Sequence, residues 1–319
     1  MFCKAGDQVR ITTQLVDVAS GNQIWADRID KIFDSTFKLQ DEISNTIVAK
    51  LPSRIQKALV DSVQQKPIET YSAYEYFLKG RWHFISSAGE DPAALTFLNK
   101  SLELDPHYAL CHAVLANLYA YNVFSLGVWY DNNEQKSRSY INNAIRYGKN
   151  NPTVHSLVGE SLYWLGEFEK ARYHLETALR LNPLDVHTMI IYGANLSGSG
   201  KSKEGLEWID KALLTDSYVS DFALESKTDC IFALHEYEQC LDIMLAWQSP
   251  PPHTYAHIAA CHAHLGNIEE AYKAADSFRE VCAKNVNFPR YAEAHGRICR
   301  LQEDKENWLS GYKKAGLLD

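Results

Sequence analysis

Small and large apolar residues recur between Ser156 and Ser217 with a spacing of 34 residues, as between Gly159 and Gly193. The first copy contains Gly159, Leu162, Gly166, Ala171, Leu175, Ala178 and Pro183. The second copy contains Gly193, Leu196, Gly200, Gly205, Ile209, Ala212 and Ser217. Apolar residues at helical spacing on either side of a glycine turn predict two consecutive helix–turn–helix hairpins.

The same pattern extends over the rest of the chain from Tyr71 onward, where only helices are predicted. The turn sequence Leu165–Ala171 reappears as Leu234–Cys240 and again as Leu265–Ala271. A first hairpin is expected from about Ala73 to Pro106, and a second from Ala109 to near Gly148 with an insertion at 126–131. Together with the two well-matched copies these segments predict about six hairpins, followed by one or two solvated capping helices.

This 34-residue pattern of small and large residues resembles the tetratricopeptide repeat. A single hairpin of this kind cannot bury its apolar face alone, so the resemblance implies hairpins stacked into an α-solenoid. The fold class expected is mainly α, a tetratricopeptide-type solenoid preceded by a short β-hairpin and a helix. The usual function implied by this resemblance is holding another protein rather than catalysis.

The first 30 residues have a different pattern, in which apolar and polar residues alternate. Val9, Ile11, Thr13 and Leu15 share one face, and a turn at 19–22 leads to a returning strand at 23–29. The alternation predicts a two-stranded β-hairpin over residues 8–30. Apolar residues at helical spacing then predict a helix from about residue 34 to residue 63, which Pro52 should kink or break.

Segments at both ends resemble a second known family. Lys4–Leu15, Gly21–Arg28 and Leu39–Ile43 are similar to the closing half of a TolB-like amino-terminal domain, and Trp308–Leu317 is similar to the end of cyclase-linked relatives. In bacteria that domain often lies between an output module and a tetratricopeptide array. The output module is a class III adenylyl/guanylyl cyclase in many members and a winged-helix DNA-binding domain in others.

The resemblance divides the chain into a partial TolB-like α/β segment at 1–66 and a tetratricopeptide-repeat solenoid with C-terminal capping helices at 67–319. The chain is expected to begin inside the TolB-like unit, without the opening strands of that unit and without an output module. No residue matches the catalytic parts of the relatives, so no activity carries over. Two strands alone are marginal in water, and we therefore expect self-association through the N-terminal strands.

Charge and composition narrow the function further. The chain has 32 Lys and Arg against 40 Asp and Glu, a net charge of −8, and no clustered basic face. This argues against a nucleic-acid partner. No segment has the length of a membrane span or the apolar core of a signal peptide. The seven scattered cysteines are typical of a reducing compartment, so a cytoplasmic protein is expected.

No motif for a nucleophile with its base is present, and no catalytic residue can be named. The chain is therefore expected not to be an enzyme and to need no cofactor. Two short motifs nevertheless carry alternatives, one for nucleotide and one for metal.

Ser197–Ser202 resembles the end of a phosphate-binding loop, in which glycine amides cradle phosphate and a lysine reaches it. Such a loop needs a glycine five residues before Gly200, where this chain has Asn195, and it should follow a strand rather than a helix. The simpler interpretation is the tight turn between the two helices of a hairpin. We therefore expect no tight binding of ATP.

A second motif places His253, His257, Cys261 and His264 on one helical stripe. Imidazole and thiolate are zinc ligands, but three or four ligands from one straight helix rarely converge in a tetrahedron. A polar stripe with a small buried cysteine is the simpler interpretation. No metal site is therefore expected.

The concave side of the predicted array is where a partner would bind, because one face of each first helix lines it. The repeat register assigns to this groove Glu160, Tyr163, Trp164, His187, Ile191, Phe222, Glu225, Asp229, Phe232, His253, His257 and His264. Aromatic anchors beside acids suit a peptide groove, although Trp164 and Phe232 could equally pack between repeats. The set contains no Lys or Arg, which disfavours partners held by a C-terminal carboxylate.

Two functional hypotheses follow from these observations. The first is a non-catalytic interaction scaffold that binds a protein or peptide in the concave groove, with no nucleic acid and no membrane involved. The second is a detached regulatory or sensory segment of a nucleotide cyclase or of a winged-helix transcription regulator. They differ in whether an output module is encoded upstream.

Overall fold

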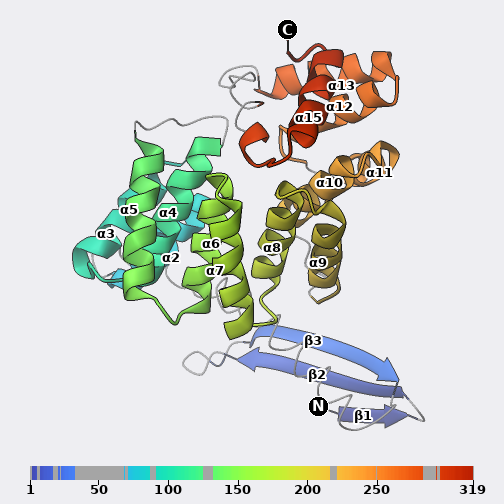
Figure 1. The fold of residues 1–319 in the computed structure, drawn as a ribbon. Helices are drawn as coiled ribbons and strands as arrows, with labels where there is room; N and C mark the ends of the chain where they lie inside the picture. Colours follow the sequence, from blue (N-terminus) through green and yellow to red (C-terminus); the bar gives the residue numbers. More distant parts are fainter. Residues whose placement is uncertain are drawn as a thin grey trace.

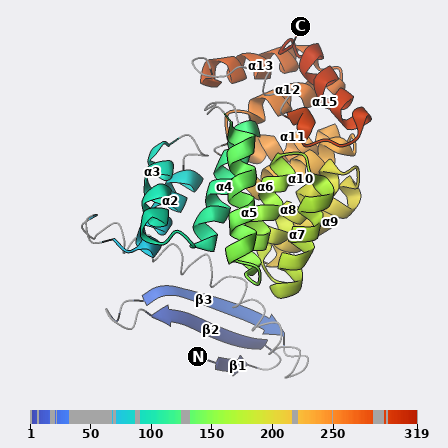
Figure 2. The same cartoon turned by 60° about the vertical axis from the view of Figure 1, so that its left-hand side comes forward.

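The computed structural model describes residues 2–5, 8–16, 21, 23–32, 68, 71–86, 91–124, 132–215, 221–248, 250–282, 292 and 295–318. The described part is mainly α, with its helices packed in pairs as tetratricopeptide-like hairpins (Figures 1 and 2). The pairs are α2 (Ala73–Ser86) with α3 (Ala93–Leu104), α4 (Ala109–Phe124) with α5 (Asn133–Tyr147), α6 (Pro152–Trp164) with α7 (Phe168–Leu181), α8 (Val186–Gly198) with α9 (Ser202–Thr215), α10 (Asp221–Ala233) with α11 (Tyr237–Ala246), and α12 (Thr254–His264) with α13 (Ile268–Cys282). We call these pairs hairpins 1 to 6, and the helices of each pair A and B.

Local sequence explains where the helices of the best-matched pairs begin. Asn151 caps α6 by accepting a hydrogen bond from the Thr153 amide at 2.9 Å, and Pro152 occupies the first turn. Asp185 caps α8 in the same way, accepting from the Thr188 amide at 2.7 Å. These two B–A connections therefore end in a residue that satisfies otherwise unpaired amides of the next helix.

The turns inside hairpins 3 to 6 share one backbone motif. Gly166, Gly200 and Gly266 have φ angles of 76°, 86° and 79°, and His235 takes the same place in hairpin 5 with φ of 61°. The amide that follows donates back across the turn to a carbonyl five residues earlier, as from Glu167 to Leu162 at 2.8 Å. This is the left-handed helix end that glycine favours, and it confirms the hairpin turn predicted from the recurring glycines.

The small residues of the repeat mark the closest approach of helix A to helix B. A Cβ atom placed on Gly80 would lie 2.7 Å from Cγ of Leu98. The corresponding distance from Gly159 to Cγ of Leu175 is 2.6 Å, and from Gly193 to Cγ1 of Ile209 it is 2.7 Å. All are shorter than real Cβ contacts, so only glycine permits these helix pairs to pack as they do.

The A helices form an inner layer and the B helices an outer layer. Residues 154–164 of α6 are all buried, whereas α7 exposes Tyr173 by 64% and Leu181 by 46%. Leu175 is fully buried at the centre of hairpin 3, where burial of such a side chain contributes about 1.5–3 kcal/mol. No described helix has the length and apolar character needed to cross a membrane.

The N-terminal segment forms three strands where two were predicted. β1 (Phe2–Ala5) pairs antiparallel with β2 (Gln8–Val16), which pairs antiparallel with β3 (Gln23–Ile32). The sheet lies to one side of the helical array (Figures 1 and 2). The prediction missed β1 because a four-residue strand gives almost no periodicity. The helix predicted from residue 34 to residue 63 falls outside the described residues.

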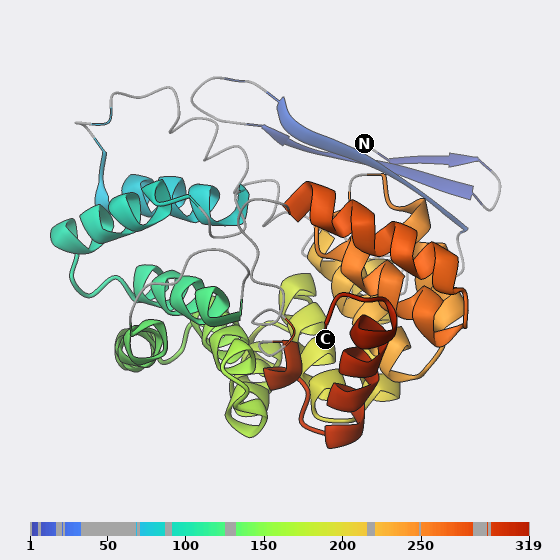
Figure 3. The same cartoon turned by 90° about the horizontal axis from the view of Figure 1, so that it is seen from above.

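The C-terminal segment corrects the prediction of a solvated cap. One face of α15 (Gln302–Lys314) is buried, with Trp308 exposed by 5% and Tyr312 by 0%. α15 packs against α12, and in Figure 1 it lies beside α12 and α13. Viewed from above in Figure 3, the dark red C-terminal segment lies close to the yellow-green helices in the middle of the array.

Replacement of Ala171 by Trp should destabilise the chain. Ala171 is fully buried on α7, and its carbonyl lies 3.2 Å from the Cβ position of Gly159, so no space exists for an indole. Overpacking typically costs about 1–3 kcal/mol. Chemical denaturation should show this loss for Ala171→Trp, whereas the exposed Tyr173→Trp on the same helix should leave the midpoint nearly unchanged. Equal midpoints for both variants would contradict the assigned packing.

Candidate partner-binding groove

The residue that follows the small A-helix position differs in chemical type from one hairpin to another. Hairpins 1, 3 and 5 have a charged residue there, namely Arg81, Glu160 and Asp229. In hairpins 4 and 6 the position is held by alanine, Ala194 and Ala260. The groove is therefore polar in some hairpins and small and apolar in others.

The first half of the groove centres on Glu160 of α6. His187 of α8 lies with Nε2 3.1 Å from a Glu160 carboxylate oxygen. Burial tends to lower the pKa of His187, but Glu160 outweighs it and the pKa is raised. The half-buried ring of Phe222 lies beside this pair, with its centroid 6.3 Å from His187 and 6.1 Å from Trp164.

Arg81 of α2 adds a positive charge that the sequence analysis did not assign to the groove. Burial lowers the pKa of its guanidinium, and the carboxylates of Glu160 and Asp185 act against this. The predicted groove set contained no basic residue, whereas Arg81 lies near enough to Glu160 and Asp185 for their charges to act on it. The signal was present in the sequence, because Arg81 follows Gly80 as Glu160 follows Gly159.

The second half of the groove contains a cluster of titratable residues on α10 and α12. Nε2 of His253 lies 2.6 Å from a carboxylate oxygen of Glu225. Burial raises the pKa of Asp229 to about 7; Glu225 adds to the rise and His253 opposes it. His257 lies 3.9 Å from Asp229, and burial holds the pKa of its imidazole well below the usual range.

The C-terminal helix of the chain itself occupies this second half. The indole of Trp308 stacks on Phe232 with ring centroids 3.5 Å apart and planes within 9°. The same indole lies 4.6 Å from the ring of His257 and 4.5 Å from that of His295. The chain fills the groove so closely that a cavity of only about 20 Å³ remains between Asp229, Trp308 and their neighbours.

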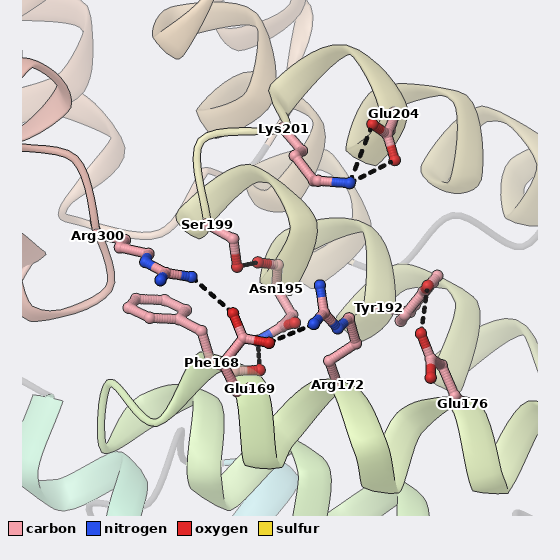
Figure 4. A network of polar contacts seen from close by, with 10 residues as sticks. All are labelled: Phe168, Glu169, Arg172, Glu176, Tyr192, Asn195, Ser199, Lys201, Glu204 and Arg300. Carbon is pink, nitrogen blue, oxygen red and sulfur yellow. Dashed lines mark hydrogen bonds and ion pairs between the residues drawn. The ribbon is translucent and has the colours of Figure 1, made fainter.

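The residues preceding α15 cross the turns of hairpins 3 and 4. The Arg300 amide donates to the Gly198 carbonyl at 2.7 Å, and a Cβ atom on Gly198 would lie 2.4 Å from the Ile298 carbonyl oxygen. The Arg300 guanidinium lies 2.6 Å from Glu169, which also accepts from Arg172 (Figure 4). Ile298 itself is buried in the main hydrophobic core.

Figure 4 also shows how the turn resembling a phosphate loop is held by protein groups. Ser199 Oγ donates to the Asn195 carbonyl at 2.6 Å, and Lys201 pairs with Glu204 at 3.3 Å. The Asn195 amide donates to the Phe168 carbonyl at 3.3 Å, which ties hairpin 4 to hairpin 3. The glycines of this segment provide space for the C-terminal segment, as Gly200 does for Leu301.

The histidine stripe of α12 is divided among different partners. His253 faces Glu225, His257 faces Trp308, and His264 Nε2 donates to the Asn307 carbonyl at 2.9 Å. Cys261 is buried on α12, and the side chain next to it on α11 is that of Cys240. The described residues contain no group of three His, Cys, Asp or Glu side chains placed to hold a metal ion.

The structure separates the residues assigned to the groove into three groups. Ile191 is exposed by 0% and belongs to the core, so it is not accessible to a partner. Phe232 is exposed by 1% and stacks on Trp308, which is the packing role left open for it above. Also buried are Tyr163, Trp164, Glu160 and His257. Partly or fully exposed on the inner side are His187, Phe222, Glu225, Asp229, His253 and His264. Their role in binding a partner stays a prediction.

Comparisons with known proteins agree with this architecture. Residues 152–185, which comprise hairpin 3 and its flanking residues, match the tetratricopeptide repeat family. Hairpin 3 is thus a tetratricopeptide repeat, and the other pairs are packed in the same manner.

One curated relative is similar over 173 residues with 25% identity, the "Putative adenylate cyclase 3" of Rhizobium meliloti (strain 1021). The similarity covers 53% of this chain and 29% of that protein, so the match spans less than a third of the relative.

Solved structures with a similar fold include PilF of Pseudomonas aeruginosa, with 18% identity, a TM-score of 0.46, and coverage of 70% of this chain and 96% of that one. A tetratricopeptide repeat protein from Parabacteroides merdae has 19% identity, a TM-score of 0.44, and coverage of 76% and 92%. YrrB, described as a TPR protein with an unusual peptide-binding site, has 16% identity, a TM-score of 0.38, and coverage of 59% and 93%.

Replacement of Gly198 by Ala should loosen the crossing of residues 295–301. The new methyl group would collide with the Ile298 carbonyl, so the hydrogen bond from the Arg300 amide should weaken and that amide should exchange faster with solvent. Gly296→Ala is the matched control, because its nearest neighbour, Lys305 Cγ, is 4.0 Å away. Equal exchange at Arg300 in both variants would contradict the close contact.

The imidazole of His187 should titrate above its ordinary pKa of about 6.5 because Glu160 favours the charged form. The pair is therefore present below that raised pKa and is lost as the pH rises through it. Glu160→Gln should lower the pKa measured for the His187 ring by NMR. Burial and the charge of Arg81 both lower this pKa, and the variant removes the carboxylate of Glu160 that opposes them. An unchanged titration curve would show that the two side chains do not interact in solution.

Proposed function

We propose that the chain is a non-catalytic interaction scaffold that binds a protein or peptide partner in the first half of its concave groove. Tetratricopeptide arrays generally bind proteins, and the match at residues 152–185 supports this class. The observation that carries the proposal is the composition of the inner surface around α6, α8 and α10. Phe222 offers an aromatic anchor there, next to the charges of His187, Glu160 and Arg81.

This combination favours binding over chemistry. A partly exposed aromatic ring beside paired charges provides apolar contact area and orientation, which are the properties of interface anchors. The charged side chains Glu160 and His187 are paired with each other. The partner class we propose is therefore a peptide or protein segment, with no nucleic acid and no cofactor required.

A second candidate function is the regulatory or sensory segment of a nucleotide cyclase. The similarity to an adenylate cyclase of Rhizobium meliloti favours it, although the match covers only 29% of that protein. In this case the partner in the groove would belong to the signalling protein itself. The winged-helix alternative rests on the TolB-like resemblance alone.

The scaffold proposal is tested by capture of partners from cell extract with three variants. Phe222→Ala removes the aromatic anchor and Arg81→Glu reverses the groove charge, so each should reduce the recovery of a partner at least severalfold. Tyr173→Ala, an equally simple loss of an exposed ring on the outer helix α7, should leave recovery unchanged. Thermal melts of all variants establish that each is folded.

Recovery that is the same for all variants would contradict binding in the first half of the groove. Identification of the captured protein separates the two candidates, because the second requires a nucleotide cyclase or a measurable change in its rate.

A further inference from the structure

α15 lies in the second half of the groove in the manner of a bound helical ligand. Its buried residues are Trp308, Gly311, Tyr312 and Ala315, which have the i, i+3, i+4, i+7 spacing of a single helix face. Its exposed residues include Glu303, Glu306, Lys313 and Lys314. An amphipathic helix that places these anchor positions in an apolar groove is a recurrent mode of peptide recognition.

Each anchor has a matching feature on the groove. Trp308 stacks on Phe232, as described above, and Tyr312 lies 6.3 Å from the ring of His257. A Cβ atom on Gly311 would lie 2.8 Å from the Cβ of Ala260, so a small residue is required there. Ala315 packs with four further alanines of α12 and α13, namely Ala259, Ala263, Ala271 and Ala275.

Polar contacts fix the position of the helix along the groove. Tyr237 donates its hydroxyl to Asn307 Oδ1 at 2.7 Å, and the Asn307 amide donates to the Phe232 carbonyl at 3.4 Å. His264 donates to the Asn307 carbonyl, and its ring stacks on Tyr237 with centroids 4.6 Å apart. The groove thus recognises one asparagine one residue before the tryptophan as well as the apolar face.

The groove walls also contain buried residues that belong to the hairpins themselves. Ile231, Cys240, Leu241 and Met244 of α10 and α11 are buried, in the same hydrophobic cluster as Trp308 and Tyr312 of α15. The backbone of α15 is hydrogen-bonded within its own helix, so its departure would leave no row of unpaired amides. Departure would uncover Phe232 and His257, which are the residues that a replacing helix would cover.

We propose that the groove of hairpins 5 and 6 is a helix-binding site whose tethered occupant is α15, and that a partner helix enters only when α15 leaves. The partner chemistry is that of α15 itself: an amphipathic helix with Trp and Tyr one turn apart, a small residue before the Tyr, and Asn before the Trp. This rests on the proposed scaffold function and adds a second, covered site to the uncovered first half. A site that is mostly closed binds a free ligand more weakly in proportion to its open fraction.

The test uses the full chain and a fluorescein-labelled synthetic peptide of residues 300–318. The double variant Trp308→Ala/Tyr312→Ala removes both anchors of α15 and should open the groove. Fluorescence anisotropy should show that the peptide binds this variant at least about tenfold more tightly than the unmodified chain. The matched control is Glu306→Ala/Lys313→Ala, which changes two exposed residues of α15 and should bind the peptide no better than the unmodified chain.

A third substitution locates the binding. Adding Ala260→Leu to the double variant should abolish the gain, because the leucine fills the space that Gly311 of the peptide needs. A peptide carrying the two alanines should bind no variant. Binding that survives Ala260→Leu, or an equal affinity of all chains for the peptide, would overturn the proposal.

A measurement on the unmodified chain applies if the double variant does not fold. Excess isotope-labelled peptide should increase amide exchange in the chain's own α15 while α10 and α12 stay protected. Exchange of α15 that is unaffected by the peptide would show that it is a permanent part of the core, and the proposal would fail. The capture experiment with Phe222→Ala does not depend on the exchange of α15. The proposed scaffold function and the proposed displacement of α15 can therefore be contradicted independently of each other.

Discussion

The array depends on the close approach of helix A to helix B at one small residue in each hairpin. At Gly80, Gly159 and Gly193 even a methyl group would meet the opposing leucine or isoleucine at 2.6–2.7 Å. Because the helices touch there, the residue one position later is turned to the inner side of the array. The same constraint that pairs the helices therefore selects which side chains line the groove, and it explains why the repeat has a fixed period.

The identity of that next residue divides the groove into two parts. Arg81 and Glu160 give the first half charged side chains, and Phe222 is partly exposed beside His187. Ala194 and Ala260 are small: Ala260 lies against Gly311 of α15, and Ala194 lines the small cavity beside Trp308. The second half is occupied by the chain itself. Burial lowers the pKa of His257 and His295 there, whereas Glu225 raises the pKa of His253 against the effect of burial.

The sequence predicted the helical hairpins well because each is encoded by local periodicity and by a turn glycine. The repeat register also assigned an inner face to the A helices, but it did not indicate which residues of that face are covered. The contact of Asn307 with Phe232 joins residues 75 positions apart, and no local pattern indicates such a pairing. The spacing of Trp308, Gly311, Tyr312 and Ala315 indicates an amphipathic helix. It does not indicate which surface that helix covers. Strand β1 was missed because four residues are too few to establish an alternation.

The occupation of the second half of the groove by α15 depends most directly on the position of Trp308. Selective protonation of the aromatic rings in an otherwise deuterated chain permits this contact to be measured by NMR. We expect nuclear Overhauser effects from the Trp308 indole to the Phe232 ring and to the rings of His257 and His295, because their ring centroids lie 3.5–4.6 Å from that of the indole. A Trp308 indole without cross-peaks to any of these rings, and accessible to a soluble quencher, would contradict it.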